Sequence, residues 1–315
     1  MIKNTEKEID EYFLRISKKM QMPPLYKSFE KDAIEVNGEK IHLDILRKGK
    51  DKPTIVFIPG TAIYAMVFTE LLYKLGEAGF NIVGFDPRGH GRSGGKRGSY
   101  TITQLIDDTL AVTEYAKKHF NNDISLFGSS QGGIVAFYIS AMNLPDIKSV
   151  VCQNFADLTA PDIKRLSRFP KLAGVAAPIL QKVAKIAPEL PVPINLYLDL
   201  SKEKLKHFGD FEKFIDQDPL SIKSIRLKAL ASLTNTPLPK PIEEISTPIM
   251  VIQGTSDLIF PVSYTRKLFN KLTCKKKLHL YPKLHHAMLA ENVDEVLPPI
   301  IEWLNEIHEV DSKKS

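Results

Sequence analysis

The sequence predicts an α/β fold in which a mostly parallel, doubly wound sheet carries a helical insertion. Short apolar runs typical of buried strands alternate with longer amphipathic stretches typical of helices, and this alternation implies a parallel sheet covered on both faces. The alternation stops between residues 155 and 240, which contain nine of the 21 prolines, and then resumes. We therefore expect a core formed by residues 1–154 and 241–315, with residues 155–240 inserted as a helical cap.

The elements expected before residue 155 follow from the spacing of apolar residues. Residues 1–20 predict an amphipathic helix, which packs on the core edge or, as the alternative, lies on a membrane surface. Asn37-Gly38, between two strand-like runs, predicts a tight β-hairpin. The apolar positions of the first helix are Ile2, Ile9, Phe13, Ile16 and Met20. We further expect strands at 33–36, 41–46, 54–58, 81–85, 123–127 and 148–153, and helices at 66–78, 101–119 and 131–142.

Prolines determine the expectation for the inserted segment. Because proline lacks a backbone N–H and ends helices, we expect short helices and no buried strand between residues 155 and 240. After Pro248 the alternation predicts strands at 249–253 and 277–281 and helices at 263–272 and 294–307.

Composition excludes several classes of protein. Hydrophobic residues make up 43% of the chain and charged residues 25%, which rules out disordered and low-complexity classes. Cys152 and Cys274 are too few for a disulfide framework or a cysteine-rich zinc site. The charged N-terminus does not resemble a signal peptide, and no run of about 18 apolar residues indicates a membrane span. We therefore expect a cytoplasmic protein.

The net charge of +6 is concentrated in the expected cap. Residues 155–240 contain 14 basic and nine acidic residues, an excess of five positive charges. A mild basic excess is compatible with an anionic substrate or membrane surface. It does not require nucleic acid, and we expect no nucleic-acid partner. The oligomeric state is not readable from the sequence.

The strongest motif is Gly128-Ser129-Ser130-Gln131-Gly132, which fits G-x-S-x-G with Ser130 at its centre. It stands between an expected strand and an expected helix, the context that this motif requires. The chain must reverse from strand to helix within a few residues, which strains the backbone at the serine. Glycine at positions 128 and 132 avoids side chains that would collide in this turn. The motif therefore predicts a serine nucleophile beside the N–H groups of a helix, which can stabilise an oxyanion.

A serine nucleophile needs an adjacent base, and the base needs an orienting carboxylate. Asp257 follows an expected strand, and His285 and His286 follow the last one, so all three stand at strand ends. An aspartate after Gly-Thr-Ser is often only a turn residue, and a lone histidine is more often structural. Their order and placement together indicate a catalytic set.

These segments together resemble the α/β-hydrolase family, in particular its capped serine-hydrolase branch, which includes monoacylglycerol lipases and lysophospholipases. The resemblance extends over roughly residues 30–310, but no motif of the cap contributes to it. The segments that carry it are Pro59-Gly60-Thr61, Asp86-Pro-Arg-Gly-His-Gly-Arg-Ser93, Gly128-Ser-Ser-Gln-Gly132, Gln253-Gly-Thr-Ser-Asp257 and His286 with Glu291. It implies an α/β-hydrolase fold and acyl transfer to water.

The resemblance also implies a role for each residue. Ser130 would be the nucleophile, His286 the general base and then acid, and Asp257 the orienting carboxylate. The backbone N–H groups of Gln131 and Thr61 would form the oxyanion hole. Many members have His-Gly where this chain has Pro59-Gly60, which changes how the loop is held but leaves a backbone N–H as the donor. His286 is favoured over His285 because the family's histidine commonly precedes a glutamate at this spacing.

One segment imitates a cofactor motif. Gly89–Gly94 matches G-x-G-x-x-G, the dinucleotide fingerprint, but these glycines do not open a helix. The resemblance instead implies a structural turn, in which Asp86 pairs with Arg88 or Arg92. Neither a zinc-binding spacing nor a cofactor motif remains, so we expect no metal and no organic cofactor.

The substrate must be predicted from the cap, where apolar residues alternate with Lys and Arg. One interpretation is an amphipathic cap with a solvated basic face. The other is an apolar roof for an acyl chain, to which Leu166, Phe169 and Leu172 would contribute, with basic residues near an anionic headgroup or membrane surface. The second predicts a monoacyl lipid ester, such as a monoacylglycerol or lysophospholipid. The alternatives are a hydrolase of small esters, lactones, thioesters or C–C bonds with the same triad, or a non-catalytic binding protein on this fold.

Overall fold

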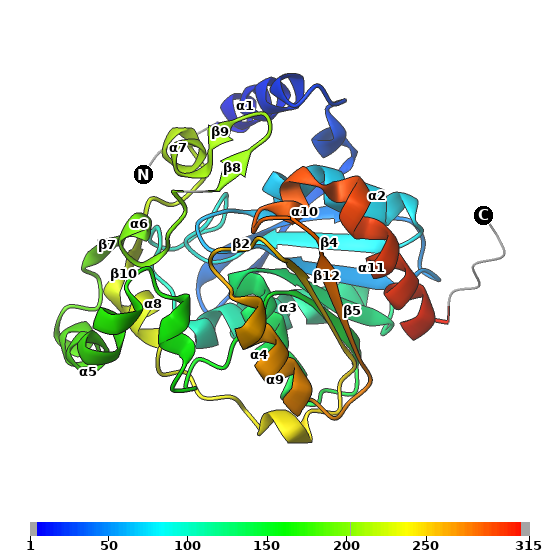
Figure 1. The fold of residues 1–315 in the computed structure, drawn as a ribbon. Helices are drawn as coiled ribbons and strands as arrows, with labels where there is room; N and C mark the ends of the chain where they lie inside the picture. The colour runs from blue at the N-terminus through cyan, green and yellow to red at the C-terminus, as the bar shows by residue number, and fades with distance from the viewer. Residues whose placement is uncertain (1–4, 202, 310–315) are drawn as a thin grey trace.

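The computed structural model describes residues 5–201 and 203–309, and its centre is an eight-stranded sheet (Figure 1). The strand order is β1-β2-β4-β3-β5-β6-β11-β12. β2 pairs antiparallel with β1 and β4, whereas the pairs from β4 through β12 are parallel. The strands are β1 Glu30–Val36, β2 Glu39–Leu46, β3 Thr54–Ile58, β4 Asn81–Asp86, β5 Ile124–Ser129, β6 Ile147–Gln153, β11 Ile249–Gly254 and β12 Lys276–Tyr281. The expected mostly parallel sheet and its N-terminal hairpin are confirmed.

Helices cover both faces of the sheet, which confirms the doubly wound arrangement. α3, α4 and α9 pack on one face, whereas α2 and α11 pack on the other. Within β3, Val56 faces the first layer and Phe57 the second, so the strand is buried on both sides. The core helices are α1 Glu6–Lys19, η1 Leu25–Ser28, η2 Ala65–Phe68, α2 Thr69–Glu77, α3 Ile102–His119, α4 Gln131–Ser140, η4 Ile242–Glu244, α9 Val262–Lys271, α10 Met288–Glu291 and α11 Val293–Ile307.

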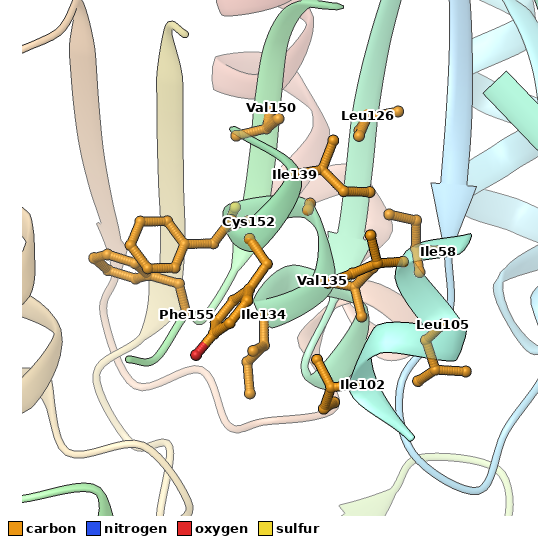
Figure 2. Close-up of a cluster of buried hydrophobic side chains, with 14 of the residues drawn as sticks. Ile58, Ile102, Leu105, Leu126, Ile134, Val135, Ile139, Val150, Cys152 and Phe155 are labelled. Atoms are coloured by element: carbon orange, nitrogen blue, oxygen red, sulfur yellow. The ribbon is translucent and has the colours of Figure 1, made fainter. Parts of the chain in front are cut away.

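α4 is the most deeply buried of the core helices, because every one of its ten residues is buried. Figure 2 shows part of its surroundings, with Val135 and Ile139 of α4 among side chains that include Ile58 and Val150 of the neighbouring strands. The helix that follows the G-x-S-x-G motif is therefore held rigidly against the sheet.

The N-terminal helix packs on protein. α1 begins at Thr5, whose side chain accepts the N–H of Glu8 while the Glu8 carboxylate accepts the N–H of Thr5, a capping box. Tyr12 and Phe13 are buried against the core, as expected for a helix at the core edge. Ile2, which was expected to belong to this helix, lies outside the described residues.

The segment between β6 and β11 corrects two expectations. α5 is 17 residues long and continues through Pro178. Pro178 removes one backbone hydrogen bond, which need not break a helix. Pro170 stands in the first turn, where proline is favourable. A two-stranded ribbon, β7–β10, buries Val192 and Ile225, although no buried strand was expected. The elements are η3 Ile163–Leu166, α5 Pro170–Ile186, β7 Pro191–Pro193, α6 Ile194–Tyr197, β8 Lys204–Leu205, β9 Gly209–Asp210, α7 Phe211–Gln217, β10 Ser224–Arg226 and α8 Leu227–Ser232.

In Figure 1 this segment lies to one side of the sheet, and its β8, β9 and α7 lie beside α1. Across residues 5–201 and 203–309, none of the helices combines the length and apolar character needed to cross a membrane.

Candidate active site

Ser130 occupies a sharp turn between β5 and α4. Its φ is 53° and its ψ is −114°, a conformation that non-glycine residues rarely adopt. A Cβ atom on Gly128 would lie 2.1 Å from the carbonyl oxygen of Gly132, and one on Gly132 would lie 2.1 Å from that of Ile58. Both glycines are therefore required by close backbone contacts. The structure thus forms the elbow at the positions that the motif predicts.

The structure brings Ser130, His286 and Asp257 together. His286 Nε2 lies 3.0 Å from Ser130 Oγ, and His286 Nδ1 lies 2.8 Å from Asp257 Oδ2. The backbone N–H groups of Ile259 and Phe260 donate to Asp257 Oδ1 at 2.8 and 2.9 Å, which fixes the carboxylate. This geometry lets the carboxylate orient the imidazole, and lets the imidazole accept the serine proton.

Electrostatics favour the charged state of the histidine–aspartate pair. Burial by itself lowers the pKa of His286, but the charge and hydrogen bond of Asp257 outweigh burial, so the pKa of His286 is raised. Burial raises the pKa of Asp257, yet His286 and the backbone donors lower it overall. His285, in contrast, is exposed, and His286 is the histidine that pairs with Ser130 and Asp257.

Two residues at the end of β6 support the site, and sequence reasoning missed both. Asn154 Nδ2 donates to Asp257 Oδ2 at 3.1 Å, the same oxygen that faces His286. Gln153 Nε2 donates to the carbonyl oxygen of His286 at 2.5 Å, while its Oε1 accepts from Ser129 Oγ at 2.6 Å. A signal was available, because these residues end the strand next to the elbow strand, at the sheet edge where ligands bind in α/β folds.

The expected oxyanion donors, Thr61 and Gln131, both adjoin Ser130. A Cβ atom on Gly60 would lie 3.2 Å from Ser130 Cβ, so the loop that carries Thr61 touches the serine directly. Gln131 is the first residue of α4, where a helix leaves N–H groups unpaired. Among the described residues, no acceptor receives the N–H of Thr61 or Gln131. Both groups are available to a ligand beside Ser130.

Polar side chains next to Thr61 are buried beside the same site. Gln131 Nε2, the Tyr100 hydroxyl and the Tyr197 hydroxyl are buried and form no hydrogen bond to any part of the chain that the structure describes. Both hydroxyls interact with the Thr61 side chain, though not at hydrogen-bond geometry. Burial raises the pKa of Tyr100 and of Tyr197, so their hydroxyls stay protonated and can donate. These atoms can form further hydrogen bonds to a ligand or to water.

Two cavities meet at Ser130. The first has a volume of about 100 Å³ and is lined mainly by apolar and aromatic side chains of α1, the loop after β3, residues 194–214 and α10. The second has a volume of about 510 Å³ and lies between α4, residues 158–167, α5 and α8. The serine can therefore be reached by a substrate that extends in two directions.

The expected roof residues divide between the cavity and the surface. Leu166 lines the second cavity. Phe169 and Leu172 are 47% and 66% exposed and line neither of these two cavities. α5 instead turns Ala177 and Leu180 toward the cavity. The helix is apolar on both sides, and spacing alone does not indicate which side is covered.

The G-x-G-x-x-G segment forms a packed turn. Arg92 Nε donates to Asp86 Oδ2 at 3.1 Å, and Arg92 also pairs with Asp44, which settles the two alternatives in favour of Arg92. Arg88 pairs instead with Asp108 of α3 at 2.5 Å. A Cβ atom on Gly91 would lie 2.2 Å from Asp86 Oδ2, so this glycine permits the turn's own packing. Among residues 5–201 and 203–309, no cluster of three or more His, Cys, Asp or Glu side chains is arranged to hold a metal ion.

The mostly parallel sheet, the elbow and the Ser-His-Asp arrangement at its strand ends define the class of α/β hydrolases. Within that class, the model of the family described as "Serine aminopeptidase, S33" (Hydrolase_4) matches residues 49–293, and the chain belongs to this family.

Several known proteins are similar over most of their length. A monoacylglycerol lipase of Mycolicibacterium smegmatis is 23% identical over 278 residues, which span 85% of this chain and 94% of that protein. The structure of Paleococcus ferrophilus monoacylglycerol lipase has a TM-score of 0.65 at 23% identity and covers 84% of this chain and 99% of that one. A soluble variant of monoglyceride lipase from Saccharomyces cerevisiae has a TM-score of 0.70 at 18% identity, over 89% and 95% of the two chains. These structural likenesses show a common fold.

Proposed function

We propose that this protein hydrolyses carboxylic esters through an acyl-enzyme formed on Ser130. The observation that carries the proposal is the position of the His286 imidazole, between Ser130 Oγ at 3.0 Å and Asp257 Oδ2 at 2.8 Å. A serine hydroxyl is a poor nucleophile until such a base removes its proton. The positive φ of Ser130 also supports the proposal. Strained backbone of this kind costs free energy and occurs mostly at active sites, where the surrounding structure imposes it.

The proposed reaction has two halves. Ser130 Oγ attacks the ester carbonyl carbon while His286 Nε2 takes the hydroxyl proton, and a tetrahedral oxyanion forms. The imidazolium returns that proton to the leaving alcohol oxygen as the C–O bond breaks, which leaves the acyl group on Ser130. Water then attacks the acyl carbon while His286 takes its proton, and the imidazolium gives that proton to Ser130 Oγ as the bond between Oγ and the acyl carbon breaks, which releases the carboxylic acid.

The backbone N–H groups of Thr61 and Gln131 are proposed to stabilise both oxyanions. Their lack of other acceptors among the described residues supports this role. A donor of this kind is worth about 10²- to 10³-fold in rate in other serine hydrolases.

We propose monoacyl lipid esters, such as a monoacylglycerol or a lysophospholipid, as the substrate class. Named relatives that are monoacylglycerol lipases support this class. Mainly apolar walls in the first cavity also suit an acyl chain. Buried polar atoms of Gln131, Tyr100 and Tyr197 near Thr61 suit hydroxyl or ester oxygens of a substrate.

Residues 155–240 are proposed to act as the cap. They contribute walls to both cavities, including Leu198, which lines each of them. The outer side of α5 exposes Ile179, Ile186 and Leu172 at 63%, 86% and 66%, with exposed lysines nearby in sequence. Exposed apolar side chains with adjacent basic groups suit peripheral contact with an anionic membrane surface.

A substrate panel with the purified protein tests the proposal. It contains p-nitrophenyl esters graded from acetate to palmitate, a monoacylglycerol, a lysophospholipid, a lactone, a thioester and an aminoacyl p-nitroanilide. The last is included because the family description names an aminopeptidase. We expect the highest kcat/KM for esters with medium or long acyl chains. A maximum at acetate with a steep fall would support the small-ester alternative, and no turnover of any ester would contradict the proposal.

A further inference from the structure

The N-terminal helix α1 reaches the cavity that begins at Ser130. The family match starts at residue 49, so α1 precedes the segment that the family shares. Phe13, Ile16 and Met20 of this helix nevertheless line the first cavity, together with Ser130 and His286. A segment outside the family's shared region therefore forms part of the wall of the active-site cavity.

The core holds α1 firmly at this place. Phe13 is 5% exposed, and its ring centroid lies 5.4 Å from that of Tyr26 and 6.1 Å from that of Tyr64. Arg92 lies over the same ring at 5.5 Å. The Tyr26 hydroxyl donates to the carbonyl oxygen of Asp10 at 3.1 Å. These contacts fix the wall in position, as selection between substrates of different length requires.

The cap segment also contacts α1. Lys19 Nζ lies 4.7 Å from the ring centroid of Phe208, and in Figure 1 α1 runs beside β8, β9 and α7. The Tyr12 hydroxyl interacts with the Asp218 carboxylate of this segment, and burial together with that carboxylate raises the pKa of Tyr12. The far end of the cavity is thus enclosed by α1 on one side and by the cap on the other.

We infer that α1 is a substrate-recognition wall, in which Phe13, Ile16 and Met20 contact an extended apolar chain of the ester and limit its length. The inference rests on the proposed function, because the chain belongs to an ester that is cleaved at Ser130. The mainly apolar and aromatic walls of the first cavity suit an alkyl chain. That chain is either the acyl chain or the alcohol chain. Each methylene that the wall buries contributes about fourfold to kcat/KM.

Ile16 allows a direct test, because it is half-buried at the cavity and can be enlarged or reduced. Full-length wild type, Ile16→Trp and Ile16→Ala are compared, with Lys18→Ala on an exposed position of the same helix as the control. One ester series varies the acyl chain on p-nitrophenol, and the other varies the alkyl alcohol on butyrate. Acetate hydrolysis and thermal melting are measured for every variant as controls for the reaction centre and for folding.

We expect Ile16→Trp to lower kcat/KM for the longest members of one series at least tenfold more than it lowers kcat/KM for acetate. Ile16→Ala should shift the optimum of the same series to longer chains, and Lys18→Ala should match wild type. A shift in the acyl series assigns the cavity to the acyl chain, and a shift in the alcohol series assigns it to the alcohol. Unchanged length profiles in folded, active variants would contradict the role of α1 and leave the proposed function intact. A wild type that cleaves no ester would overturn it together with the proposed function.

Discussion

Asn154 donates a hydrogen bond from Nδ2 to Asp257 Oδ2 at 3.1 Å, and that same oxygen faces His286 Nδ1 at 2.8 Å. Asn154 itself has a φ of 65°, so the backbone at the end of β6 is bent to present this side chain. The carboxylate is therefore held by one amide side chain and two backbone N–H groups at the same time. A fixed carboxylate is what keeps the imidazole aligned with the serine.

Asn154→Gly removes this hydrogen bond while it tolerates the positive φ. We expect kcat to fall roughly tenfold to a hundredfold with little change in KM, because a hydrogen bond to a charged group is worth about 1.5–3 kcal/mol. Asn37→Gly is the matched control, since Asn37 also has a positive φ but lies in the β1–β2 hairpin. Steady-state kinetics on one ester decide the question, and a loss below twofold would argue against this role for Asn154.

The pH profile of kcat/KM tests the electrostatics of His286. The imidazole accepts a proton only when it is neutral, so activity must rise with pH as His286 loses its proton. Because the pKa of His286 is raised, we expect the midpoint of the acid limb above about 6.5. A midpoint below 6 for a neutral ester would contradict the predicted effect of Asp257.

Glu203, in the segment between β6 and β11, should modulate the same profile. Its carboxylate is fully buried, which raises the pKa of Glu203 itself, and its charge raises the pKa of His286. We expect Glu203→Gln to move the acid limb to lower pH, whereas Glu243→Gln, at an exposed position, leaves it unchanged. An unshifted limb in Glu203→Gln would show that this carboxylate does not act on the histidine.

The buried pair Arg88–Asp108 should stabilise the fold. Both side chains are buried, and Arg88 Nε also donates to Asp108 Oδ2 at 3.0 Å. Arg88→Leu leaves the carboxylate buried without its partner, so we expect the free energy of unfolding to fall by about 3–5 kcal/mol. Arg88→Leu/Asp108→Leu should recover part of that loss. Urea unfolding followed by the fluorescence of Trp303, the single tryptophan, measures both.

The control for this pair is Lys277→Ala, whose partner Glu302 is exposed. Loss of an exposed ion pair should cost at most about 1 kcal/mol. Equal losses for Arg88→Leu and Lys277→Ala would contradict the role given to burial.

The exposed side of α5 predicts binding to anionic vesicles. Ile179→Asp/Ile186→Asp places two negative charges on this side, and we expect at least a tenfold loss of affinity for phosphatidylglycerol vesicles in sedimentation assays. Lys118→Glu, at an exposed position of α3, controls for the change of net charge. Unaltered binding, or no binding by wild type, would contradict the proposed membrane contact.

Local signals made much of the fold predictable. The apolar run at 54–58 coincides with β3. A strand that is buried on both faces is apolar at nearly every position, so it can be recognised as a continuous apolar run. The elbow was equally predictable, since its two glycines stand next to Ser130 in sequence. Asp257 and His286 could be proposed because parallel strands bring their carboxyl ends to one edge.

Other features depend on contacts between segments that are distant in sequence. Gln153 and Asn154 support the site only because β6 pairs with both β5 and β11, and no motif marks them. Phe169 and Leu172 were assigned to the pocket from their apolar character, but the packing of α5 places them at the surface. The proposed role of α1 as a cavity wall could not be predicted from its amphipathic pattern. That pattern indicates that one side of the helix is buried, but it does not indicate which residues cover that side.

The most direct test of the central claim is labelling of the intact protein with a fluorophosphonate probe, followed by mass spectrometry of its peptides. The probe reacts with a serine only when a neighbouring base activates it. The structure predicts a single adduct on Ser130, no adduct in Ser130→Ala, and a strongly slowed reaction in His286→Ala. Labelling of a different serine, or ester hydrolysis that persists in a folded Ser130→Ala variant, would contradict the assignment of Ser130 as the nucleophile.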